Sequence, residues 1–218
     1  MRSFSAFLRK FLFAFIVKPF IYIVLGYNVE GYEYFPQKGP AILVANHNSH
    51  VDTLLLMSLF SNSLISKVHP AAAADYFCNG KIKSFIFKNL MGIIPLTRKV
   101  TRENKDNIFS GIYETLSKGE IIILYPEGTR GNDENIQNFK QGIAHIAKDN
   151  PNVPIIPVYM SGTEKILPKL ELILVPFISD IYISEPMFWD NSTTKDFTQK
   201  IQEKIIAMKE IHKKNELL

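Results

Sequence analysis

Short apolar runs alternate with longer mixed runs from residue 39 onward, which predicts strands that alternate with helices. The shortest runs lack polar positions altogether, as is typical of strands buried on both faces. Strands or extended segments are expected at 41–45, 68–73, 93–96, 121–124, 155–159, 172–175 and 181–184. Helices are expected at 51–60, 82–90, 101–116, 139–147 and 195–216. This order predicts an α/β fold with a mostly parallel or mixed central sheet flanked by helices.

Residues 4–27 form the most apolar segment, and Lys18 and Pro19 divide it into the uncharged runs 11–17 and 19–27. Neither run reaches the roughly 20 residues that a spanning helix needs, and no small-residue signal-cleavage site follows. Basic residues among Phe, Leu and Ile favour helices that lie in a membrane interface, with lysine and arginine at the headgroups. A buried core helix and a true membrane span are the alternatives.

The chain has 218 residues, of which 46% are hydrophobic and 21% charged, as in a globular protein. No linker separates two cores, so we predict a membrane-associated helical segment at 1–29 and one α/β domain at 30–218. Cys78 is the single cysteine, which excludes a disulfide within the chain and fits a reducing compartment. The predicted location is the cytoplasmic face of a membrane.

Positive charge is concentrated in two stretches of this chain, whose formal net charge is +4. Four basic residues and no acidic ones precede Glu30, and residues 81–105 hold seven basic residues against one acid, Glu103. Such patches attract phosphate, whether from lipid headgroups, nucleic acid or small substrates, although solvated surface is the ordinary alternative. No nucleic-acid motif or basic-aromatic interleaving accompanies them, so a nucleic-acid partner is not expected.

His47 and Asp52 lie between the strand predicted at 41–45 and the helix predicted at 51–60. With His47 on the turn and Asp52 in the first helical turn, the carboxylate can reach back and orient the imidazole as a general base. Ser49 and Asp52 also match a capping box, in which Asp52 bonds to the backbone and needs no catalytic role. His50 is a competing histidine at a poorer spacing.

Further polar residues follow other predicted strands. Arg98 ends the run Gly92 to Arg98, and the run Tyr125 to Arg130 (Tyr-Pro-Glu-Gly-Thr-Arg) follows the strand at 121–124. Lys140 is expected at the start of a helix, and prolines bracket the strand within Val153 to Val158. Because ligand sites of α/β sheets form at the carboxyl ends of strands, these groups are expected to meet.

These four blocks resemble those of the glycerolipid acyltransferases, most closely the 1-acylglycerol-3-phosphate acyltransferase type. Asn46, His47 and Asp52 match the first block, and the segments beginning at Gly92, Tyr125 and Val153 are similar to the other three. The resemblance covers roughly residues 40 to 163. Tyr125 stands where the family usually has phenylalanine, and Gly131 where it usually has serine or threonine.

The resemblance implies transfer of a fatty acyl group from an acyl thioester, on coenzyme A or acyl carrier protein, to a lysophospholipid hydroxyl. His47 would be the general base and Asp52 its orienting partner, without a covalent acyl-enzyme. Arg98 and Arg130 would bind the acceptor phosphate, and Lys140 would be a further phosphate contact. Glu127 and Gly128, followed by Thr129, would shape the acceptor site. No cofactor and no metal are expected.

Two alternatives stay open at this point. One is an acyltransferase that acts on another lysolipid, and the other is a non-catalytic phospholipid-binding protein on the same scaffold. Acyl transfer by the wild-type chain and its loss on His47→Ala would separate catalysis from binding alone.

Overall fold

The computed structural model describes residues 2–49, 51–74, 86–97, 108–129, 131, 136–166 and 175–216. The described strands form a seven-stranded sheet in the order β1-β7-β6-β2-β5-β3-β4. Only the β6–β7 pair is antiparallel among these neighbours. The strands are β1 (Tyr27–Glu30), β2 (Ala41–Ala45), β3 (Val68–Ala73), β4 (Ile94–Leu96), β5 (Ile121–Leu124), β6 (Ile155–Ser161) and β7 (Ser179–Ile183). The predicted mixed α/β sheet is therefore confirmed.

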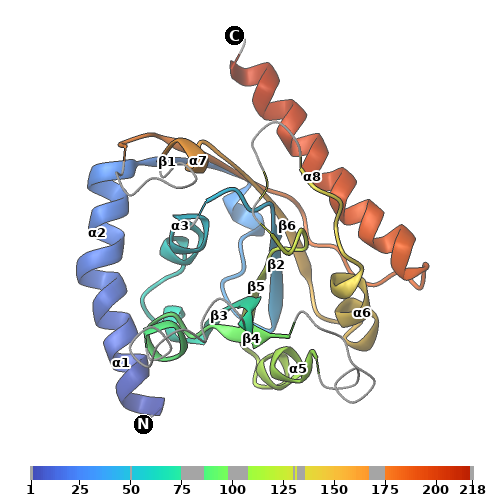
Figure 1. Cartoon of the computed structure of the whole chain (residues 1–218), viewed down its shortest axis with the longest axis horizontal. Coiled ribbons are helices and arrows are strands. Elements are labelled where there is room, and N and C mark those ends of the chain that lie inside the picture. Colours follow the sequence, from blue (N-terminus) through green and yellow to red (C-terminus); the bar gives the residue numbers. More distant parts are fainter. Residues whose placement is uncertain are drawn as a thin grey trace.

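Helices cover both faces of the sheet (Figure 1). The N-terminal helix and α3 lie on one face, and α5, α6 and α8 lie on the other. The α-helices are α1 (Arg2–Leu12), α2 (Lys18–Phe20), α3 (Val51–Leu59), α5 (Ser110–Ser117), α6 (Gly142–Asp149), α7 (Thr163–Ile166) and α8 (Thr194–Glu216). The π-helical segments are η1 (Phe13–Val17), η2 (Ile21–Leu25) and η6 (Ile86–Met91), and the 3₁₀ turns are η3 (Tyr32–Tyr34) and η4 (Ile65–Lys67).

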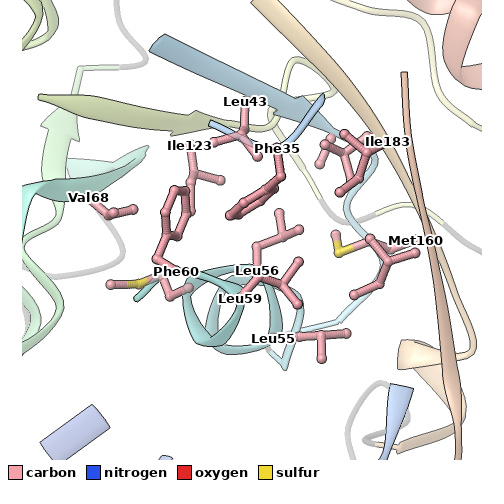
Figure 2. Packing of buried hydrophobic residues seen from close by; sticks show 14 of the residues in the cluster. Phe35, Leu43, Leu55, Leu56, Leu59, Phe60, Val68, Ile123, Met160 and Ile183 are labelled. Carbon is pink, nitrogen blue, oxygen red and sulfur yellow. The ribbon is translucent and has the colours of Figure 1, made fainter. Parts of the chain in front are cut away.

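The central strands are apolar throughout because they are buried on both faces. Every residue of β2 and β5 is buried, as expected for parallel strands between two helical layers. On the α3 side, the side chains of Leu43 and Ile123 meet those of the helix, and the rings of Phe35 and Phe60 lie 4.4 Å apart (Figure 2). This layer fixes α3, and with it Asp52, against the sheet.

Several predicted element bounds need correction. β1 was not expected, because Tyr27 to Glu30 show no apolar run. The helix predicted from 139 begins at Gly142, so Lys140 lies in the preceding loop, where its amide donates to the Pro126 carbonyl at 2.9 Å. The helix predicted from 101 is described from Ser110, and residues 101–107 lie outside the described part. Most of the strand predicted at 172–175 also lies outside it.

The N-terminal segment is helical from Arg2 to Leu25, and the helix continues through Pro19. Pro19 lies in α2 between the π-helical segments η1 and η2, and the flanking residues Val17 and Ile21 keep right-handed helical backbone angles. Among the described residues, no helix combines the length and the apolarity needed to cross a membrane. The division into 1–29 and 30–218 stays a prediction.

Two basic side chains of this helix point inward, contrary to the expectation that they reach lipid headgroups. Arg9 is only 5% exposed, and its guanidinium donates to the carbonyls of Ile65 at 3.2 Å and Val68 at 3.0 Å. Lys18 donates to the Phe60 carbonyl at 2.6 Å. Burial lowers the pKa of Arg9 to about 10 and lowers the pKa of Lys18. These bonds dock the helix on the protein.

Candidate functional site

The candidate site lies at the carboxyl ends of the central parallel strands. His47 follows β2, and Tyr125 and Glu127 follow β5, which pairs directly with β2 through Val44 and Leu124. Asn46 fastens the same edge to β6, because its side-chain amide donates to the Met160 carbonyl and accepts from the Met160 amide, both at 2.8 Å. The register therefore brings the first and third predicted blocks to one edge.

His47 and Asp52 form the predicted contact, with 2.8 Å between the imidazole Nδ1 and the carboxylate Oδ2. The same oxygen accepts from the amides of Asn48 at 2.7 Å and Ser49 at 2.8 Å. An oxygen that accepts from two amides is an acceptor for the imidazole as well, so Nδ1 carries the proton. In the neutral ring of this tautomer Nε2 has a lone pair, as a general base requires.

The two side chains differ in exposure in the way that this role needs. The His47 side chain is 21% exposed, whereas that of Asp52 is 0% exposed. Solvent or a substrate hydroxyl can therefore reach the imidazole but not the carboxylate. The bond from the Ser49 amide is also one half of the predicted capping box, so Asp52 serves the helix start and the imidazole together.

The carboxylate of Glu127 accepts hydrogen bonds from main-chain amides of two separate segments. It accepts from the His47 amide at 2.9 Å and from the Gln137 amide at 3.1 Å, and the residue is 3% exposed. Burial raises the pKa of Glu127, and the two amide donors oppose that shift. Glu127 thus positions the backbone of His47, while its predicted contact with an acceptor hydroxyl stays a prediction.

Gly128 and Lys140 lie next to each other. Gly128 has a φ of +72°, and a β-carbon there would approach the Lys140 ammonium nitrogen to 2.5 Å. A side chain at position 128 would thus be strained and would push the lysine away. The exposed Thr129 donates to the side-chain oxygen of Gln137 at 3.1 Å.

Arg98 and Arg130, the predicted phosphate-binding residues, and His50 lie outside the described residues. Gly131, which follows Arg130 in the sequence, donates its amide to the His47 carbonyl at 2.8 Å. Among the described residues, no group of three or more His, Cys, Asp or Glu side chains is arranged to hold a metal ion.

Three contributors to this site were not predicted from the sequence. The ring of Tyr125 stacks on the imidazole of His47, with centroids 4.2 Å apart and planes inclined by 20°. The Tyr125 hydroxyl lies 3.0 Å from the Thr53 hydroxyl, and Gln137 joins Glu127 to Thr129. The aromatic residue at the end of a strand was a usable signal for the stack, whereas nothing local marks Gln137.

Comparison with known proteins extends this picture. A family model described as Acyltransferase matches residues 26–161. A chloroplastic 1-acyl-sn-glycerol-3-phosphate acyltransferase of Arabidopsis thaliana is 30% identical over 77% of this chain and 44% of its own length. The alpha form from Mus musculus is 31% identical over 66% of this chain and 48% of its own length. The chain thus spans less than half the length of these relatives.

The crystal structure of PlsC, the 1-acyl-sn-glycerophosphate acyltransferase of Thermotoga maritima, has the same fold. It superposes with a TM-score of 0.70 at 22% identity and covers 98% of both chains. The matched region contains His47, Asp52 and the strand ends that surround them. This chain belongs to the acyltransferase family.

Proposed function

We propose that this protein transfers a fatty acyl group from an acyl thioester to the free hydroxyl of a lysophospholipid, most specifically 1-acylglycerol-3-phosphate, which yields phosphatidate. The observation that carries the proposal is the His47–Asp52 pair, in which a fully buried carboxylate contacts Nδ1 of a partly exposed imidazole. The curated relatives, named as 1-acyl-sn-glycerol-3-phosphate acyltransferases, support the choice of acceptor.

In the proposed reaction, Nε2 of His47 takes the proton of the acceptor hydroxyl as its oxygen attacks the thioester carbonyl carbon. A carbon–oxygen bond forms, and the carbon–sulfur bond breaks as the tetrahedral intermediate collapses. The imidazolium returns the proton to the departing thiolate. Asp52 holds the ring orientation and stabilises the imidazolium, so no covalent acyl-enzyme is required.

Binding of the acceptor phosphate is assigned to three cations, Lys140, Arg98 and Arg130. Lys140 is the described candidate, because its ammonium group lies next to Gly128 on the loop that follows β5. Arg98 and Arg130 complete the proposed set, since a guanidinium can bind two phosphate oxygens at once. The acyl donor is a thioester of coenzyme A or of acyl carrier protein.

The proposal includes attachment to a membrane surface at its cytoplasmic face. Apolar side chains stand exposed along the N-terminal helix, and Phe4, Phe7, Phe11 and Phe15 recur at helical spacing on it. Val24 and Leu25, at the end of the helix, line one apolar pocket with Pro176, Phe177 and Ile178. A long apolar stripe of this kind suits the headgroup–acyl boundary, where the lipid acceptor resides.

The test combines the purified chain with lysophosphatidate vesicles and either acyl-CoA or acyl carrier protein thioester. Thiol release and mass spectrometry of the lipids are followed for wild type, His47→Ala and His145→Ala. His145 is an exposed histidine on α6, so its replacement is the matched control.

Phosphatidate formation by wild type and His145→Ala, with none by His47→Ala, is the expected result. Full turnover by His47→Ala would overturn the dyad. Binding of lysophosphatidate without any thiol release would favour the non-catalytic lipid-binding alternative. If a mixed pool of lysolipids gives the product of a different lysolipid, that lysolipid is the acceptor in place of lysophosphatidate.

A further inference from the structure

Tyr125 joins the end of β5 to the first turn of α3, across the face of the proposed catalytic base. Its ring lies on the imidazole of His47 with centroids 4.2 Å apart, and its hydroxyl lies 3.0 Å from that of Thr53. Thr53 is the next residue after Asp52 on α3. The imidazole is therefore linked to the first turn of α3 in two ways. Asp52 contacts its edge, and Tyr125, which contacts Thr53, covers its face.

The two anchors restrict different motions. The bond from Nδ1 to Asp52 restrains one edge of the ring, whereas rotation about the Cβ–Cγ bond, which tilts the ring plane, is also opposed by whatever lies on the ring faces. A second ring stacked within 20° of parallel blocks such rotation on one face. The stack has a fixed position only if Tyr125 is itself held, and the hydroxyl contact with Thr53 holds it.

Burial raises the pKa of the Tyr125 phenol well above its ordinary value, with a smaller contribution from the charge of Asp52. The phenol therefore stays protonated at neutral pH, and it exchanges a hydrogen bond with Thr53 rather than placing a second anion beside Asp52.

We propose that Tyr125 and Thr53 are positioning residues, whose mutual hydrogen bond holds the Tyr125 ring against His47 and so fixes the imidazole plane for proton transfer. This inference rests on the proposed acyl transfer for its catalytic consequence, but the geometric part does not depend on it. Neither residue takes part in the proton transfer in this scheme. Loss of their bond should therefore lower kcat and leave KM for both substrates unchanged.

The variants are Tyr125→Phe, Thr53→Val and the double variant. Each single change should lower kcat by about 3- to 10-fold, the range expected for one lost neutral hydrogen bond. The double variant should fall no further, because both changes remove the same bond. Thr53→Ser keeps the hydroxyl and should recover most of the kcat that Thr53→Val loses.

Tyr113→Phe is the matched control. The Tyr113 hydroxyl donates to the Asp149 carboxylate at 2.6 Å, away from the site, so its removal deletes a tyrosine hydrogen bond without touching His47. Its kcat should equal that of wild type. Additive losses in the double variant, or a parallel rise of KM, would overturn a positioning role.

A spectroscopic measurement separates this inference from the proposed function. Chains labelled with ¹⁵N only in histidine report the five imidazoles, and the His47 signals are those missing from His47→Gln. Tyr125→Phe and Thr53→Val should shift the His47 nitrogen signals alike, whereas Tyr113→Phe should not. If wild type lacks acyl transfer, the proposed function fails while these signals still decide the positioning. Unchanged His47 signals in both variants would refute the inference.

Discussion

At the scale of single residues, one carboxylate oxygen of Asp52 both caps the start of α3 and contacts the His47 imidazole. Its Oδ2 accepts the imidazole Nδ1–H together with the amides of Asn48 and Ser49. The amide bonds belong to the start of α3, and the imidazole bond belongs to the proposed chemistry. The helix start therefore preorganises the carboxylate, so that no separate element is needed to aim it at His47.

Asp52→Asn should lower kcat by about 10³- to 10⁴-fold, as is typical when an amide replaces the carboxylate that orients a catalytic histidine. The amide can present its N–H₂ to the ring, which favours the wrong tautomer, and it stabilises the imidazolium less. Steady-state thiol release measures the loss. Asp196→Asn, on an exposed aspartate in the first turn of α8, is the control and should leave kcat unchanged. Equal rates for Asp52→Asn and wild type would contradict this role.

Glu127 should make the folded state less stable as the pH rises from acid toward neutrality. Burial raises its pKa above the ordinary 4.5, so the native state binds its proton more tightly than the unfolded chain does. Its contribution is fully present below pH 4.5 and is lost as the pH rises through the raised pKa. Glu127→Gln cannot titrate, so its free energy of unfolding should lack this decline, as measured by urea unfolding across the range.

Glu185→Gln is the control for that experiment. The exposed Glu185 is paired with Lys204, which lowers its pKa, so its linkage has the opposite sign. The Glu185→Gln protein should keep the decline of wild type. The same decline in Glu127→Gln would show that another group is responsible.

At the scale of elements, the N-terminal helix is docked by polar bonds as well as by apolar packing. Phe13, Ile21 and Leu25 enter the core on the α3 side, and Arg9 binds two main-chain carbonyls at the start of β3. A buried guanidinium suits this position, because its N–H groups can donate to two main-chain carbonyls at once. The opposite side of the helix is left apolar and exposed.

Arg9→Ala should lower the free energy of unfolding by about 1–3 kcal/mol, because it removes both guanidinium bonds, although the Ile65 carbonyl keeps the Val68 amide as a donor. Denaturant unfolding measures the change. The neighbouring Lys10 is exposed on the same helix, and Lys10→Ala should change the stability by less than about 0.5 kcal/mol. Similar losses in both proteins would mean that general charge, rather than the two bonds of Arg9, docks the helix.

At the scale of the whole molecule, the N-terminal helix and the helix that carries Asp52 lie on the same side of the sheet. The N-terminal helix packs on the α3 side of the sheet (Figure 1), and α3 carries Asp52. A membrane contact made by the exposed side of the helix would therefore bring the lipid surface to the same layer of the protein as the proposed catalytic pair. This arrangement suits an enzyme whose acceptor and product both reside in a bilayer.

Replacing Phe4, Phe7, Phe11 and Phe15 together by serine should abolish sedimentation with anionic lipid vesicles. Each exposed ring contributes apolar area to the interface, and the four share one stripe. Turnover of a short-chain, monomeric lysolipid should persist, because the site residues are untouched. Phe188→Ser, at an exposed ring outside the helix, is the control and should still sediment. Undiminished binding by the fourfold variant would place the membrane contact elsewhere.

Local sequence patterns predicted much of the fold and the His47–Asp52 pair of the site. Apolar runs predicted the central strands, because strands buried on both faces have no polar positions. The His47–Asp52 pair was within reach of the sequence, since a turn and one helical turn separate the two residues. Alternatives such as the capping box could not be resolved there, because both uses need the same carboxylate at the same place.

The sequence by itself thus determined the α/β class, the order of most elements and the strand ends at which polar residues collect. Only the tertiary structure decided the pairing of β1 with β7, the inward turn of Arg9 and the stack of Tyr125 on His47. The reason is physical: periodicity records which face of an element is buried, whereas a contact between residues 56 or 78 positions apart depends on how separate elements pack.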